Sequence, residues 1–186
     1  MNRFLIVVPI IGPTVNDLAR QCSSAVDQGA DILEFRLDCF NTEALHQYQY
    51  FYPRKKRIVT NRHHLHAGKN SQFGWKGTEE QRFQMLLEAV NLNLDYVDVE
   101  SDYLQQLYRE ESPTKIIGSY HNWEETPHFD GLVTIYEDII KKRADIVKIT
   151  TMAQTPHDGS MMLRFIECYA HKFPLIGIAM GEYGTG

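Results

Sequence analysis

The chain is poor in the features that mark secreted, membrane-spanning and nucleic-acid-binding proteins. Its three cysteines, Cys22, Cys39 and Cys168, are odd in number and far apart, so no disulfide framework is expected and a reducing cytoplasm is indicated. The apolar run at the start, from Phe4 to Ile11, is too short to span a bilayer. The net charge of −5 offers no positive surface for nucleic acid or an anionic membrane. With 186 residues, 43% of them apolar, we expect a cytoplasmic globular protein with a substantial core.

Short apolar runs alternate with longer amphipathic segments along the whole chain. We expect strands at 3–10, 31–38, 56–61, 95–100, 115–120, 145–150 and 174–180, with helices at 14–28, 43–51, 78–92, 101–110, 132–143 and 160–172. This alternation predicts a parallel sheet with right-handed crossovers, in the α/β class. A strand rhythm of this kind predicts a (β/α)8 TIM barrel, truncated after its seventh strand, as one domain of residues 1–186. A doubly wound sheet is the alternative, but it usually carries a G-x-G-x-x-G loop, and "PIIGPT" offers none.

Polar residues recur at the C-terminal ends of the predicted strands. In a barrel these ends meet at one mouth, where catalytic groups gather. In chain order the candidates are Glu34, Arg36, Arg62, Asp98, Glu100, His121, Lys148 and Met180. Glu34 and Arg36 lie on one strand and could equally form a buried ion pair.

Lys148 is the most distinctive of these residues because Ile146, Val147 and Ile149 surround it in the sequence. A lysine in such a strand must pair with an acid, reach water or give up its proton, and a neutral amine can form an imine with a ketone. The plainer alternative is an ion pair with Glu34 or Glu100. His121, taken alone, could merely cap a strand end. An amine and an imidazole on consecutive strands together favour an imine-forming enzyme.

The segment "RHHLHAG" contains three histidines, His63, His64 and His66. Their compact spacing lacks the helix or strand register that directs three imidazoles at one ion. We therefore expect a solvated loop here and no metal site.

Six segments in order resemble type I 3-dehydroquinate dehydratase, the Schiff-base enzyme of the shikimate pathway. They are "GADILEFRLD", "IVTNR", "DYVDVE", "IIGSYHNWEETP", "ADIVKITTMAQ" and "PLIGIAMGEYG", and they span nearly the whole chain. The resemblance implies a (β/α)8 barrel that converts 3-dehydroquinate to 3-dehydroshikimate without metal or organic cofactor. It implies that Lys148 forms the imine and that His121 is the acid and base. It also implies that Glu34, Arg36 and Arg62 contact substrate or order the site and that Met180 lines the pocket.

Two departures from the family pattern stand out. The family has a glutamate four residues after the third-strand arginine, where this chain has His66, so His66 or Glu100 becomes the candidate partner of His121. The chain also ends at "GEYGTG", before the family's substrate-binding arginine and last strand. We therefore expect a truncated barrel, with a homodimer or a fusion to shikimate dehydrogenase as its possible assembly. A class I aldolase and a catalytically inactive fragment are the alternative functions.

Overall fold

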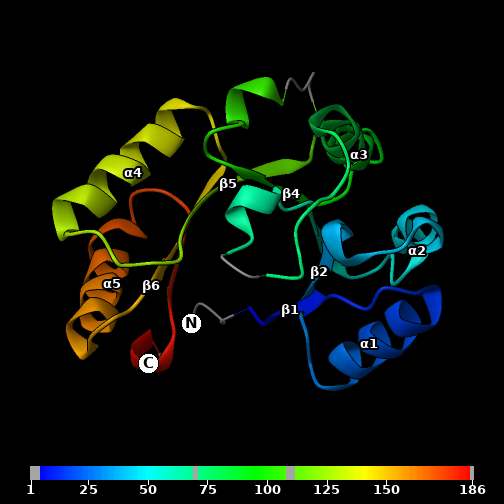
Figure 1. The fold of residues 1–186 in the computed structure, drawn as a ribbon, viewed down its shortest axis with the longest axis horizontal. Coiled ribbons are helices and arrows are strands. Elements are labelled where there is room, and N and C mark those ends of the chain that lie inside the picture. Colours follow the sequence, from blue (N-terminus) through cyan, green and yellow to red (C-terminus); the bar gives the residue numbers. More distant parts are fainter. Residues whose placement is uncertain (1–4, 69–70, 108–111, 185–186) are drawn as a thin grey trace. The chain divides into compact units, whose positions relative to one another are not determined.

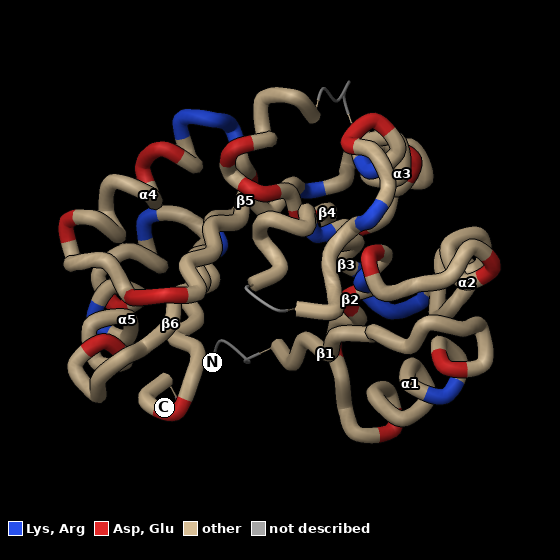
Figure 2. The backbone as a smooth tube through the Cα atoms, viewed as in Figure 1, with Lys and Arg blue, Asp and Glu red and all other residues tan. Residues whose placement is uncertain are grey.

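The computed structural model describes residues 5–68, 71–107 and 112–184. The chain forms two compact units (Figure 1). Unit 1 comprises the chain up to Asp98 and a short segment ending at Thr114. Unit 2 comprises the segment that begins at Val99 and the chain from Lys115 onward. Acidic and basic residues are distributed over both units (Figure 2). In the described part of the chain, no helix is both long enough and apolar enough to cross a membrane.

Unit 1 is a parallel βα arrangement in which strands follow one another in chain order. Its strands are β1 (Val7–Ile10), β2 (Ile32–Arg36), β3 (Lys56–Thr60) and the first part of β4 (Tyr96–Glu100), and its helices are α1 (Val15–Asp27), α2 (Thr42–Gln47) and α3 (Glu79–Asn91). Thr14 caps α1 by accepting a hydrogen bond from the Asp17 N–H, and Gly29 follows the helix with φ +93°. These boundaries agree with the cap and stop that the sequence predicts.

Unit 2 repeats the same arrangement with β5 (Lys115–Asn122), β6 (Ile146–Met152) and β7 (Leu175–Met180), which pair in parallel. Helices α4 (Phe129–Lys141) and α5 (Pro156–Tyr169) cover one face of these strands (Figure 1). Gly118 and Gly177 identify that face, because an added Cβ would lie 2.6 Å from Ile139 of α4 and 2.6 Å from Ile166 of α5, respectively.

The register then fixes which β6 residues face the helices. Gly118 pairs with Val147 and Gly177 pairs with Ile149, and both partners are fully buried. Because side chains alternate along a strand, Lys148 and Thr150 lie on the opposite face.

Two sequence predictions require correction. The helix expected over 101–110 is absent from its described part, which forms a turn and a short 3-10 helix, Leu104–Gln106; residues 108–111 lie outside the described residues. One such turn is enough to bury both Leu104 and Leu107.

His121 also lies inside β5 rather than beyond it, because pairing with β6 continues through His121↔Thr150 and the following residue.

Candidate active site

Lys148 and His121 lie on the same face of adjacent strands in unit 2. The register pairs Ser119 with Lys148 in one row and, two residues further along, His121 with Thr150 in the next row on the same face, and paired residues of parallel strands point to the same side. Both side chains are half-buried. The His121 ring stacks on Trp123, with ring centroids 6.3 Å apart. The structure therefore places a primary amine and an imidazole one row apart, an arrangement suited to imine formation with proton transfer at the neighbouring carbon.

Met180 and Glu100 are the other predicted residues of unit 2. Met180 pairs with Met152 at the end of β7 and is half-buried. Glu100 ends β4 and is 1% exposed. The N–H of the next residue, Ser101, donates to the Ser119 carbonyl at 2.7 Å. This bond brings the end of β4 beside β5, the strand that carries His121.

Arg36, in unit 1, is held by a carboxylate that sequence reasoning missed. Its Nε and Nη2 donate to the two oxygens of Asp38 at 2.9 and 2.7 Å. Burial lowers the pKa of Arg36, but the hydrogen bonds and charge of Asp38, with added attraction from Glu34, outweigh burial and raise it. The sequence suggested Glu34 as the ion-pair partner of Arg36, whereas the ion pair observed here is between Arg36 and Asp38. The signal for it was the final residue of "DILEFRLD".

Asp38 also organises the backbone around it. Its side chain is fully buried and accepts hydrogen bonds from the Arg62 N–H at 3.3 Å and the Gly74 N–H at 3.1 Å. One carboxylate therefore joins the end of β2, the second residue after β3 and the loop that precedes α3.

Glu34 and Arg62 each have a partner on a neighbouring strand of unit 1. Thr60 donates to Glu34 at 2.7 Å. Arg62 donates to Asp98 at 3.1 Å, with both side chains almost fully buried. Since these partners fix the ionised groups in place, Glu34, Arg36 and Arg62 are preorganised rather than free to rotate.

The histidine-rich segment is a short 3-10 helix, His64–His66, next to His63. The Nδ1 atom of His63 accepts from the Leu65 N–H at 3.1 Å, and its Nε2 lies 3.3 Å from Glu79. The rings of His63 and His66 are 5.9 Å apart. Among the described residues, no group of three acidic, histidine or cysteine side chains is arranged to hold a metal ion. His64 and Leu65 are exposed, as expected for a solvated segment, whereas His63 is 4% exposed and packs inside.

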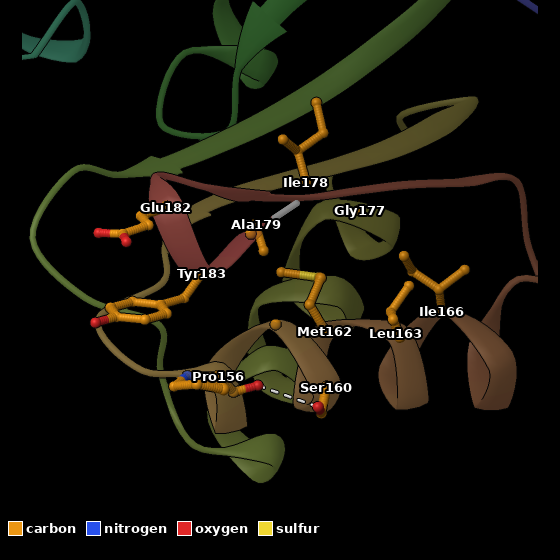
Figure 3. Close-up of a pocket in the computed structure, with 12 residues that line it drawn as sticks. Pro156, Ser160, Met162, Leu163, Ile166, Gly177, Ile178, Ala179, Glu182 and Tyr183 are labelled. Atoms are coloured by element: carbon orange, nitrogen blue, oxygen red, sulfur yellow. Dashed lines mark hydrogen bonds between the residues drawn. The ribbon is translucent and has the colours of Figure 1, made fainter. Parts of the chain in front are cut away.

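Each unit also contains a cavity beside its strands. The unit 1 cavity, about 1000 Å³, is lined by residues that follow β1 and β2, including Gly12, Asp38 and Cys39, and by Trp75. The unit 2 cavity, about 470 Å³, lies between α5, β7 and the 3-10 helix Glu182–Gly184 (Figure 3). Lys148 lines neither of these two cavities.

Comparison with known proteins decides the family. The model of the type I 3-dehydroquinase family matches residues 6–185. The chain belongs to this family. A relative from Methanococcus maripaludis, named 3-dehydroquinate dehydratase, is 33% identical over 97% of this chain and 81% of its own length.

Solved structures confirm the α/β barrel class predicted for this type I 3-dehydroquinase. The 3-dehydroquinate dehydratase of Geobacillus kaustophilus matches 98% of this chain and 76% of its own, with a TM-score of 0.86 and 22% identity. The dehydroquinate dehydratase and shikimate dehydrogenase of S. pombe matches 98% of this chain and 37% of its own, with a TM-score of 0.76 and 22% identity. The fold is therefore that of the predicted family across almost every residue.

Proposed function

We propose that this type I 3-dehydroquinase dehydrates 3-dehydroquinate to 3-dehydroshikimate through an imine on Lys148. Membership of the family supports the substrate and the hydro-lyase reaction. The observation that carries the assignment of residues is the shared face of β5 and β6, on which Lys148 and His121 lie one row apart. This membership favours the dehydratase over the aldolase alternative.

The proposed reaction begins with attack of the Lys148 amine on the substrate ketone. Loss of water from the resulting carbinolamine gives an iminium ion, which withdraws electrons from the adjacent carbon. His121 removes a proton from that carbon, and an enamine forms. His121 then returns the proton to the departing hydroxyl, which leaves as water. Hydrolysis of the imine releases the product and restores the amine, so the net change is the loss of one water.

The remaining predicted residues receive proposed supporting roles. We assign substrate contacts to Glu34, Arg36, Arg62 and Met180. The two arginines are suited to oxygen-rich substrates because buried carboxylates keep their guanidinium groups charged and oriented. For the partner of His121 we propose Glu100, a buried carboxylate of the same unit, because a carboxylate stabilises a charged imidazole and a second imidazole does not. His66 instead packs beside His63.

We further propose that the enzyme works in the cytoplasm without metal or organic cofactor. Its three cysteines are free thiols, which suits a reducing compartment. The two-enzyme protein of S. pombe motivates the proposal that this chain works beside a shikimate dehydrogenase. A homodimer is the other proposed assembly.

Borohydride trapping tests the proposed chemistry directly. The chain is mixed with 3-dehydroquinate and reduced, and the modified peptide is located by mass spectrometry. We expect one adduct on Lys148, with none after Lys148→Ala, because reduction converts an imine to a stable amine. Lys115→Ala, at an exposed position on β5, is the matched control and should retain the adduct. An adduct elsewhere, or turnover by Lys148→Ala, would rule out the assignment.

A further inference from the structure

Thr150 carries a buried hydroxyl that the protein itself does not satisfy. The residue is 5% exposed, and among the described residues its Oγ1 has no hydrogen-bond partner. Burial of a hydroxyl without a partner is unfavourable, whereas a valine of the same shape would avoid this penalty. A buried, unsatisfied hydroxyl therefore requires an explanation outside packing.

The position of Thr150 on β6 supplies that explanation. It lies two residues beyond Lys148 on the same face of the strand, and it pairs with His121 on β5 and Ile178 on β7. The hydroxyl is therefore on the face that carries both proposed catalytic groups. It lies beside His121 on the neighbouring strand and one row from Lys148 on its own strand.

The next residue shows what a satisfied threonine looks like on this strand. Thr151 is fully buried on the opposite face, and its hydroxyl lies 2.9 Å from that of Thr126. The Thr126 hydroxyl also donates to the Met152 carbonyl at 2.9 Å, so it accepts from Thr151. The strand thus carries two adjacent buried threonines. Thr151, on the helix side, forms a hydrogen bond within the protein, and Thr150 does not.

We propose that Thr150 is a substrate-contact residue whose hydroxyl hydrogen-bonds a ring hydroxyl of the ketone held as an imine on Lys148. The contact satisfies the buried Oγ1 and turns the carbon beside the imine toward His121. This inference rests on the proposed function and adds to it a binding residue that the family resemblance did not supply. Because the contact is neutral, its contribution is modest and falls on substrate affinity and orientation.

Paired variants test this role. Thr150→Val keeps the shape and removes the hydroxyl, so we expect kcat/KM to decrease about three- to tenfold, mainly through KM. Thr150→Ser keeps the hydroxyl and should retain most of the activity. The melting temperature of Thr150→Val should equal or exceed that of the wild type, because the variant removes an unsatisfied group. If the role of Thr150 were purely structural, Thr150→Val would instead lower the melting temperature and leave kcat/KM unchanged.

Thr151→Val is the matched control. It should lower the melting temperature, since it breaks the bond to Thr126, and leave KM unchanged. Wild-type turnover together with an unaltered kcat/KM in Thr150→Val would overturn the role of Thr150 and leave the proposed function standing. A wild-type chain that neither turns over 3-dehydroquinate nor is trapped by borohydride would overturn both.

Discussion

Asp38 illustrates how one buried carboxylate can hold several binding groups in position. It accepts hydrogen bonds from the Arg36 guanidinium, from the Arg62 N–H after β3 and from the Gly74 N–H before α3. Its side chain has no exposed surface, and that of Arg36 is 21% exposed. Removal of the negative charge would leave a mostly buried cation without its partner, which is a costly change in proteins.

We therefore expect Asp38→Asn to reduce the free energy of unfolding by about 2 kcal/mol. The amide is close in shape to the carboxylate, so the loss reports the charge and one hydrogen-bond acceptor rather than packing. Urea unfolding measures the change. Asp27→Asn, at an exposed position at the end of α1, is the control and should stay within about 0.5 kcal/mol of the wild type. Equal losses of unfolding free energy in the two variants would contradict the claim that the buried Asp38 carboxylate stabilises the fold more than an exposed one.

At the scale of elements, helix-to-strand spacing in unit 2 depends on glycine. An added Cβ at Gly118 would lie 2.6 Å from Ile139 Cγ2, 2.8 Å from Ala144 Cβ and 2.9 Å from Leu104 Cδ1. Each of these neighbours is itself buried, so none of them can move into open space. Gly118 therefore sets how closely α4 packs on β5, the strand that carries His121.

Gly118→Ala should accordingly destabilise the protein by about 2 kcal/mol through overpacking. We also expect slower borohydride trapping on Lys148, because β5 must shift to admit the methyl group. Gly131→Ala, within α4, is a suitable control: alanine favours the helix, and the nearest atom to its added Cβ is the Pro127 side chain at 3.1 Å. Thermal melts of the two variants should separate clearly, and a Gly118→Ala melt equal to that of the wild type would contradict the packing argument.

At the scale of the whole molecule, the strand plan could be predicted from the sequence because buried parallel strands are short apolar runs between amphipathic helices. Three features could not. Asp38 was expected only as the last residue of a strand, because the backbone N–H groups of Arg62 and Gly74 that it binds lie far away in the sequence. The segment 101–110 has a helical composition, but its buried leucines need only one turn. Thr150 lies in an apolar strand, so the sequence does not distinguish it from its neighbours. Only the strand register places it beside His121.

The chain spans 81% of the length of the Methanococcus maripaludis relative, and the match covers 97% of this chain. About a fifth of the relative therefore has no counterpart in the printed sequence. Unit 2 exposes apolar side chains on its last elements. Leu163 of α5 is 58% and Tyr183 of the last 3-10 helix is 44% exposed, and Ile178, which points away from α5 on β7, is 39% exposed (Figure 3). A further strand and helix would bury such surface, which is favourable in proportion to its area.

We expect that an apolar strand and helix attached after Gly186 will raise the melting temperature and the yield of the Lys148 borohydride adduct. The physical reason is that burial of the exposed side chains of β7 and α5 fixes β6, their neighbour, and hence Lys148. A glycine–serine extension of equal length is the control, because it adds chain without an apolar face. If both extensions give the same melt and the same adduct yield, the cavity of unit 2 is not a docking surface for that segment.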